Sequence, residues 1–289
     1  MKQLCFPILE HLRSLITAPN AEERPLIDAL ARAGVQCRFV DWLDVESWSS
    51  ADAVSPKYLW DYHVWAAEFS AFVDALAGVH AVNHRDLLRW NFDKSYLAEL
   101  QSSGFSVAEV VVIPQGEPVN LAHLAAERGW DEVVIKPSVS AGSQDTYRSE
   151  GPIQALQSAA DHVLTRCSLL VQPFFEEIIR DGETSLLFFD GQLGHAVLRR
   201  PSPGDFRAHP MFGGEVQPTT PAPELVGRCG ELLQSLPHLP TYARIDGFTK
   251  RGEFLITEVE LIDPMLFCGA APARSIERAA EAFAAAVEA

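Results

Sequence analysis

The chain has 289 residues, 47% of them hydrophobic and 21% charged, which is an ordinary composition for a globular protein large enough to bury a sizeable core. Its formal net charge of −16 argues against a nucleic-acid-binding surface, although a nucleotide needs only a few well-placed cations. Five scattered cysteines lack metal-binding spacing, and no apolar run reaches membrane-spanning length. Glu10, His11 and Arg13 also interrupt the first apolar run, which makes it a poor signal peptide. The sequence therefore predicts a soluble cytoplasmic protein with free thiols and without a membrane partner.

Helices and strands are predicted along the whole chain. Helical spacing of apolar residues, bounded by capping and stop residues, predicts helices at 22–33, 61–77, 91–104, 121–128, 153–166, 224–236 and 273–289. Runs of β-branched and aromatic residues predict strands at 35–42, 107–113, 132–136, 168–172, 186–189, 192–198, 243–248 and 254–261. The first helix and the strand after it indicate a small α/β lobe at the N-terminus. Because helices and strands do not alternate strictly, the core is predicted to be α+β and rich in antiparallel pairs.

Turn residues divide the second half of the chain. Asp190-Gly191 between two predicted strands is a strong β-hairpin signal. Residues 201–223 are rich in proline and glycine and are predicted to form a loop. The stretch TKRG at 249–252 is also turn chemistry and separates two further predicted strands.

The stretch ARIDGFTKRGEFLITEVELIDP, residues 243–264, predicts a β-hairpin that carries four ionisable residues. Arg244 and Asp246 lie two residues apart, as do Glu258 and Glu260. If even positions pair with even positions, all four side chains share one face. Three carboxylates on one patch repel one another unless a cation lies between them, and oxygen ligands suit Mg²⁺. The alternative is a solvent-facing strand with scattered charge.

A second informative stretch is VVIKPSVSAGSQDTYR, residues 133–148. A strand ends at Lys136 and continues into a loop of small residues that includes Ser140, Gly142 and Ser143. Small residues let backbone N–H groups approach a polyphosphate closely, and the lysine supplies a point charge. The glycine patterns of P-loops and dinucleotide-binding folds are absent, so the alternative is an ordinary turn after a strand.

A third stretch, LLVQPFFEE at residues 169–177, combines a strand with a proline. Pro173 lacks an N–H group, so a strand that runs through Gln172 into this proline leaves backbone groups unpaired. Such a segment can hydrogen-bond the edge of an adenine, with Phe174 or Phe175 as an apolar wall. The alternative is a strand that simply ends at the proline.

The order of these pieces resembles that of the ATP-grasp superfamily over nearly the whole chain. The pieces are a helix-borne Lys94, Lys136 with its small-residue loop, Gln172-Pro173-Phe174, Glu183, Arg199, Arg244-x-Asp246 and Glu258-x-Glu260. The fragments RPLIDAL, RWNFDKSYL, GHAVLRRP and ELIDP, in this order, more narrowly resemble the glutathione-synthetase-like branch. That branch contains small carboxylate–amine ligases and the cyclo-ligase that forms D-cycloserine from an O-ureido-serine.

This resemblance implies an α+β, ATP-grasp fold of three lobes with mixed and antiparallel sheets. An N-terminal α/β lobe would span residues 1–90, a central lobe 91–170, and a C-terminal lobe with a metal site 171–289. The nucleotide would lie between the central and C-terminal lobes.

The resemblance also implies a role for each matching residue. The implied nucleotide-binding residues are Lys94 and Lys136 at the phosphates, Ser140, Gly142 and Ser143 in a mobile loop over them, Gln172 and the backbone at Phe174 at the adenine, and Glu183 at the ribose. The implied metal ligands are Asp246, Glu258 and Glu260, and the implied catalytic residues are Arg199 near the γ-phosphate and Arg244 on the transferred phosphoryl group. Glu260 stands where asparagine is usual in the superfamily, so the number of metal ions stays open.

The implied activity is that of an ATP-dependent ligase. It would activate a small carboxylate as an acyl phosphate for attack by an amine-type nucleophile in the same or a second molecule, releasing ADP and phosphate. ATP and Mg²⁺, with Mn²⁺ as an alternative, are the implied cofactors, and a homo-oligomer is an allowed assembly. A small-molecule kinase on the same fold and a non-catalytic nucleotide-binding protein are the alternatives. None of the nine histidines is expected to be catalytic, although His63 and His209 lie in segments expected to form the acceptor pocket.

Overall fold

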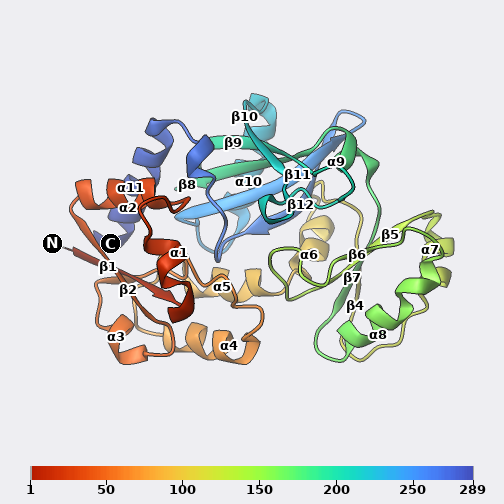
Figure 1. Cartoon of the computed structure of the whole chain (residues 1–289), viewed down its shortest axis with the longest axis horizontal. Helices are drawn as coiled ribbons and strands as arrows, with labels where there is room; N and C mark the ends of the chain where they lie inside the picture. Colours follow the sequence, from red (N-terminus) through yellow and green to blue (C-terminus); the bar gives the residue numbers. More distant parts are fainter. Residues whose placement is uncertain (1, 289) are drawn as a thin grey trace.

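Three β-sheets organise the chain, as the computed structural model of residues 2–288 shows (Figure 1). The first sheet has the order β2-β1-β3 and is parallel. Its strands are β1 (Lys2–Ile8), β2 (Val35–Asp41) and β3 (Ala53–Val54). Because helix α2 (Arg24–Arg32) connects β1 to β2, this part is the small α/β lobe that the sequence predicts.

The other two sheets follow the first along the chain, and both are antiparallel. The four-stranded sheet has the order β4-β7-β5-β6, with β4 (Val111–Ile113), β5 (Val133–Pro137), β6 (Tyr147–Arg148) and β7 (Leu169–Pro173). The five-stranded sheet has the order β10-β9-β8-β11-β12, with β8 (Glu183–Phe189), β9 (Gln192–Arg200), β10 (Glu215–Thr219), β11 (Tyr242–Lys250) and β12 (Glu253–Glu260). The prediction of an α+β core rich in antiparallel pairs is confirmed.

Helices cover the faces and edges of these sheets (Figure 1). The α-helices besides α2 are α1 (Arg13–Thr17), α3 (Val45–Ser49), α4 (Ala66–Ala75), α5 (Arg85–Phe92), α6 (Tyr96–Ser102), α7 (Leu121–Arg128), α8 (Gln157–Leu164), α9 (Glu176–Arg180), α10 (Pro223–Ser235) and α11 (Ala273–Glu288). The 3₁₀ helices are η1 (Glu10–Leu12), η2 (Ile153–Leu156), η3 (Pro210–Phe212) and η4 (Cys268–Ala270). Among residues 2–288, no helix combines the length and the apolar character needed to cross a bilayer.

One predicted helix is two helices in the structure. The sequence predicts a helix over 91–104 that carries Lys94, but Asn91 belongs to α5 and a new helix, α6, begins at Tyr96. Asp93 has extended backbone angles, φ −106° and ψ 118°, and its side chain accepts the N–H of Ser95 at 2.8 Å. The placement of Lys94 on a helix is therefore wrong, because this lysine lies in the turn between the two helices.

Four strands escape the sequence prediction, namely β1, β3, β6 and β10. Strand β1 begins at Lys2, before the first predicted element, and β10 lies inside the segment predicted as a loop. Strand β10 is at the edge of its sheet and has a neighbour on one side only, so the missing N–H of Pro218 leaves no second neighbour without a hydrogen bond. The predicted helix at 61–77 also begins late, at Ala66.

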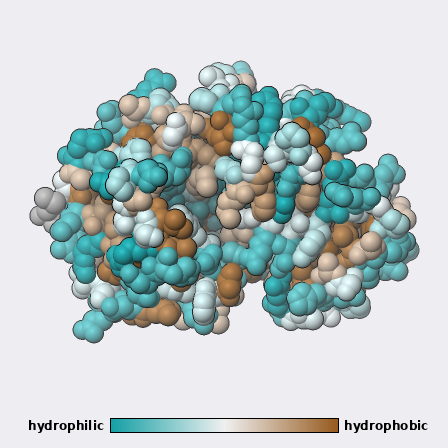
Figure 2. Space-filling model, in the orientation of Figure 1, coloured by the Kyte–Doolittle hydropathy of each residue, from teal (hydrophilic) through white to brown (hydrophobic). Residues whose placement is uncertain are grey.

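The C-terminal helix α11 packs against α2 and β1 of the first lobe (Figure 1). Its Phe283 stacks on Tyr242 of β11, with ring centroids 5.1 Å apart, and lies 6.4 Å from Phe6 of β1. One hydrophobic core thus joins the parallel sheet to the five-stranded sheet. On the outside, hydrophilic side chains cover most of the face shown in Figure 2, and apolar side chains form scattered patches.

Candidate active site

A cavity of about 740 Å³ is lined by residues from the N-terminal lobe and from both antiparallel sheets. It contains every residue that the sequence singles out except Asp246: Lys94, Lys136, Ser140, Gly142, Ser143, Gln172, Phe174, Glu183, Arg199, Arg244, Glu258 and Glu260. The predicted ligands thus gather in one place, although they come from segments more than 160 residues apart. Sites of this size take a nucleotide-sized ligand.

The hairpin β11–β12 has the register that the sequence predicts. Arg244 lies opposite Glu260, and Asp246 lies opposite Glu258, so the four side chains share one face. The turn is shorter than predicted, since only Arg251 and Gly252 connect the strands, both at positive φ.

The carboxylates of this face are neutralised by side-chain cations rather than left as an open acidic patch. Asp246 is buried and accepts from Arg244 Nε at 3.0 and 3.1 Å, while Arg199 Nη2 lies 2.9 Å from its Oδ2. Although burial opposes ionisation, these two arginines hold the pKa of Asp246 below its ordinary value. Two arginines thus lie beside Asp246 where the sequence analysis expects a cation, and a bound metal ion at this face stays a prediction.

Glu258 and Glu260 face the cavity from β12, the second strand of the hairpin. Their closest cations are Lys94, whose Nζ lies 3.1 Å from Glu258 Oε1, and Arg244, whose Nη2 lies 3.1 Å from Glu260 Oε1. Burial raises the pKa of Glu260 to about 7, against the opposing effect of Arg244. Two carboxylates that line a cavity offer the hard oxygen ligands that Mg²⁺ prefers.

Asp246 does not stand beside these two glutamates at the cavity wall. Both of its oxygens are occupied by the arginines described above, and it does not line the cavity. The structure therefore assembles two of the three predicted metal ligands and turns the third toward Arg199 and Arg244.

The two predicted phosphate-binding lysines enter the cavity from different segments. Lys136 is at the end of β5, where its side chain makes no ion pair with any carboxylate of residues 2–288, and burial lowers its pKa. Lys94 is held more tightly, because its Nζ donates to the carbonyl of Ser140 in addition to its contact with Glu258. A partly buried lysine without a carboxylate partner favours an anionic ligand at Lys136.

The small-residue loop between β5 and β6 closes one side of the cavity. Gly142 and Ser143 both have positive φ, at 59° and 58°. Gln144 Oε1 lies 2.6 Å from His63 Nε2 of the N-terminal lobe. The loop thus bridges to the first lobe, a contact that the sequence analysis did not foresee because the two residues are 81 positions apart.

The predicted adenine and ribose contacts are only partly available. Gln172 is buried at the cavity wall, and its Nε2 is without a hydrogen-bond partner in the described chain. The N–H of Phe174, by contrast, already donates to the carbonyl of Glu132 at 2.9 Å. Glu183 accepts from Arg199 at 2.7 Å and from the hydroxyl of Thr257, so both of its oxygens are engaged. The unpartnered Gln172 amide is the group that best fits a polar base edge.

A buried ionic triad at the far end of the cavity was missed by the sequence analysis. Lys57 Nζ lies 2.8 Å from Glu23 Oε2 and 2.9 Å from Asp263 Oδ1, and all three residues line the cavity. Asp263 belongs to the fragment ELIDP that the sequence analysis quoted, but its partners lie more than 200 residues away. The triad carries one net negative charge beside the space left for a substrate.

Comparisons with known proteins agree with this architecture. The family described as D-cycloserine synthetase DcsG, N-terminal domain, matches residues 10–83. The cycloserine biosynthesis protein DcsG of Streptomyces lavendulae is 32% identical over 182 residues, which cover 60% of each chain. A glutathione synthetase of Prochlorococcus marinus is 32% identical over 163 residues, 55% of this chain and 50% of that protein. The chain thus aligns with only 50% to 60% of the length of these two relatives.

Solved structures match over a greater length. The crystal structure of D-cycloserine synthetase DcsG has a TM-score of 0.82 and 25% identity, covering 99% of both chains. The ATP-grasp ligase PsnB, complexed with a minimal precursor, shares the fold at a TM-score of 0.67 and 14% identity, covering 99% of this chain and 98% of that chain. The fold is therefore the ATP-grasp fold. In sequence the chain is similar both to DcsG and to glutathione synthetase.

Proposed function

We propose that this protein is an ATP-dependent ligase that activates a small carboxylate as an acyl phosphate for attack by an amine-type nucleophile. The observation that carries the proposal is the convergence of four cations on one cavity, namely Lys94, Lys136, Arg199 and Arg244, beside Glu258 and Glu260. A phosphoryl group in transfer spreads negative charge over its oxygens, and fixed cations stabilise that charge. The relatives named above support a ligase rather than a binding protein.

Each cation has a place in this scheme. Lys136 binds the nucleotide phosphates, since it is the cavity cation that has no carboxylate partner among residues 2–288. Lys94 joins it and, through its bond to the Ser140 carbonyl, ties the phosphates to the loop that closes over them. Arg199 and Arg244 hold the acceptor side of the reaction, where the new bond from phosphorus to the carboxylate oxygen forms. Gln172 contacts the base through its free amide, and the loop at Gly142 and Ser143 excludes water from the acyl phosphate.

The residues present fit a divalent ion. Glu258 and Glu260 supply two carboxylates at the cavity wall, and Mg²⁺ is commonly held by one or two carboxylates together with substrate phosphates. Mn²⁺ fits the same oxygen ligands. Asp246 would join them as a third ligand only if Arg199 and Arg244 released its oxygens. When bound, the ion neutralises charge on the triphosphate.

The acceptor substrates enter at the end of the cavity formed by the N-terminal lobe. Trp60, His63 and the Lys57 triad line this end, and loop residues 206–209 close it from the other side. Its size fits small molecules, in keeping with a carboxylate and an amine-type group in one molecule or in two. The five free cysteines fit a reducing cytoplasm.

The test is a screen for phosphate release with ATP and Mg²⁺. Paired panels of small acids and amines are run beside single compounds that contain both groups. We expect release only with a pair, or with one bifunctional compound for an intramolecular closure. ATP turnover that any single acid supports, with a stable phosphorylated product, would instead show a kinase.

Oxygen-18 in the substrate carboxylate separates these outcomes further. In the proposed reaction one carboxylate oxygen bonds to phosphorus, and the carbon–oxygen bond then breaks when the nucleophile attacks. One labelled oxygen must therefore appear in the released phosphate. Unlabelled phosphate with a joined product would exclude the acyl phosphate.

A further inference from the structure

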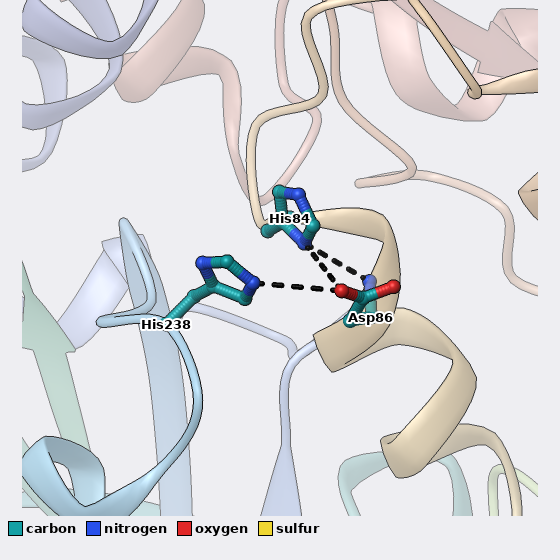
Figure 3. Close-up of side chains that lie close together, drawn as sticks. All are labelled: His84, Asp86 and His238. Atoms are coloured by element: carbon teal, nitrogen blue, oxygen red, sulfur yellow. Dashed lines mark hydrogen bonds and ion pairs between the residues drawn. The ribbon is translucent and has the colours of Figure 1, made fainter.

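Two histidines and an aspartate meet on the surface outside the cavity (Figure 3). His84 immediately precedes α5 and Asp86 is in its first turn, whereas His238 lies in the segment between α10 and β11. The three come from parts of the chain about 150 residues apart and are all exposed. Among residues 2–288, this is the one cluster of three such side chains that can reach a common metal ion.

The ligand atoms already have the spacing of a metal site. Both histidines point at the same carboxylate oxygen: His84 Nδ1 lies 3.4 Å and His238 Nε2 3.5 Å from Asp86 Oδ2 (Figure 3). Ligands at about 2.0 to 2.1 Å from a tetrahedral Zn²⁺ are separated by roughly 3.3 Å. The two imidazole rings stack with centroids 3.7 Å apart, and all ligand atoms lie within 4.8 Å of one another.

The surroundings of Asp86 orient this oxygen toward the histidines. Arg85 Nε and Arg89 Nη1 both lie 3.8 Å from the other oxygen, Oδ1. Arg89 also binds Asp74 at 2.6 Å, so its charge is shared with a second carboxylate. These contacts are longer than hydrogen bonds, but two guanidinium charges beside Oδ1 favour the orientation that leaves Oδ2 toward the histidines.

The present contacts of the histidines leave room for an ion. His84 Nδ1 accepts the N–H of Asp86 at 3.2 Å, and this long bond is the one that metal binding would replace. His238 contacts α5 only through the stacked ring and the carboxylate, among the interactions recorded for the described chain. No substrate group or cavity residue takes part, so the cluster is unused by the proposed reaction.

We propose that His84, Asp86 and His238 form a binding site for one transition-metal dication, with Zn²⁺ as the best chemical match and water in the fourth position. Two imidazoles and one carboxylate are ligands that Zn²⁺ accepts in tetrahedral geometry. The ion would connect the start of α5 to the segment that leads into β11. It would thereby hold together two parts of the chain that both continue into the active site, since Lys94 follows the first and Arg244 the second.

The experiment measures Zn²⁺ binding to tag-free protein in excess Mg²⁺, which occupies the carboxylates of the cavity. Calorimetry gives the stoichiometry and affinity for the wild type and for His84→Ala and His238→Ala. His123→Ala is the matched control, because His123 Nε2 lies 3.2 Å from Glu127 Oε1 on α7 but has no third ligand. Asp86→Asn is a further variant that keeps both imidazoles. Melting curves without Zn²⁺ show that each variant is folded.

We expect one equivalent of Zn²⁺ in the wild type and in His123→Ala. The affinity falls at least about tenfold in His84→Ala and in His238→Ala, since each loses one of three ligands. Zn²⁺ also raises the melting temperature of the wild type but not of these two variants. Wild-type protein that binds no Zn²⁺, or binding that persists unchanged in both variants and in Asp86→Asn, would overturn the proposal.

Discussion

Arg199 and Asp246 form a buried ion pair that crosses strand β8, with 2.9 Å between Nη2 and Oδ2. The same guanidinium lies 2.7 Å from Glu183 Oε2 on the strand between them, so it neutralises carboxylates of two strands. Arg244 contacts the other side of Asp246. The charged residues of these otherwise apolar strands therefore form one network, in which each group depends on its neighbours.

Removal of Arg199 is predicted to lower both the stability of the fold and the catalytic activity. Arg199→Ala leaves the carboxylates of Glu183 and Asp246 short of a buried partner, which costs about 3 to 5 kcal/mol. Urea unfolding measures this loss. Arg200→Ala is the control, because the next residue on the strand points to the opposite face, where its recorded side-chain hydrogen bond is to Gln217 at 3.4 Å. Equal stability of the two variants would contradict the network.

Replacement of Lys136 is predicted to have opposite effects on stability and on nucleotide binding. Lys136→Met removes a partly buried cation that lacks a carboxylate partner, so the ligand-free protein becomes more stable, by up to about 1 kcal/mol. Affinity for ATP falls at least about tenfold, because a charge-assisted contact to phosphate is lost. Thermal melting with and without ATP measures both effects. Lys2→Met, at the exposed start of β1, should change neither, and a destabilised Lys136→Met with unchanged ATP affinity would show a structural lysine.

The contact between Gln144 and His63 is predicted to keep the loop closed. Gln144→Ala removes a hydrogen bond of about 1 kcal/mol, so the loop opens roughly five times more often. Water then reaches the acyl phosphate, and phosphate release without product formation rises. The measurement is the ratio of phosphate to joined product. Gln101→Ala, on the exposed surface of α6, serves as the control. An unchanged ratio in Gln144→Ala would show that the contact with His63 does not hold the loop closed.

The Lys57 triad predicts a specific dependence of stability on pH. Burial raises the pKa of Asp263 to about 6, against the opposing effect of Lys57. Between pH 4 and 6 the Asp263 carboxyl is deprotonated in the unfolded chain but still protonated in the native state. The native state therefore binds more protons, and stability falls as pH rises. The fall amounts to at most about 3 kcal/mol and stops above pH 6.

Asp263→Asn removes this titration. The free energy of unfolding of the variant minus that of the wild type should therefore increase from pH 4.5 to pH 7, because only the wild type loses stability over this range. Urea unfolding at several pH values measures the difference. A difference that stays constant, or changes in the other direction, would contradict a raised pKa at Asp263.

Local patterns predicted the parts of the fold that local chemistry determines. Asp190-Gly191 specified a hairpin, and alternating residues in 243–261 specified the register that places Arg244 opposite Glu260. Lys94 was misplaced because Asp93 ends α5 with extended backbone angles and accepts the N–H of Ser95 in the turn that follows, which a helical period cannot reveal. Strand β10 was missed because an edge strand tolerates proline.

The members of the site were readable from the sequence, but their contacts were not. The order of lysines, arginines and acids along the chain indicated one cavity, and the structure brings them to it. Which acid pairs with which cation depends on distances between strands and lobes, so the enclosure of Asp246 by Arg199 and Arg244 could not be predicted. The same holds for the pairing of Lys57 with Glu23 and Asp263.

The central claim is that this cavity binds ATP through its cations and through a divalent ion at Glu258 and Glu260. The most direct measurement is a calorimetric titration with ATP, with and without Mg²⁺, on the wild type, Glu258→Gln and the exposed control Glu253→Gln. The account predicts that Mg²⁺ tightens ATP binding in the wild type and in Glu253→Gln. In Glu258→Gln, by contrast, affinity for the Mg²⁺ complex falls at least about tenfold. Wild-type affinity for this complex in Glu258→Gln, or no ATP binding by the wild type, would contradict the account.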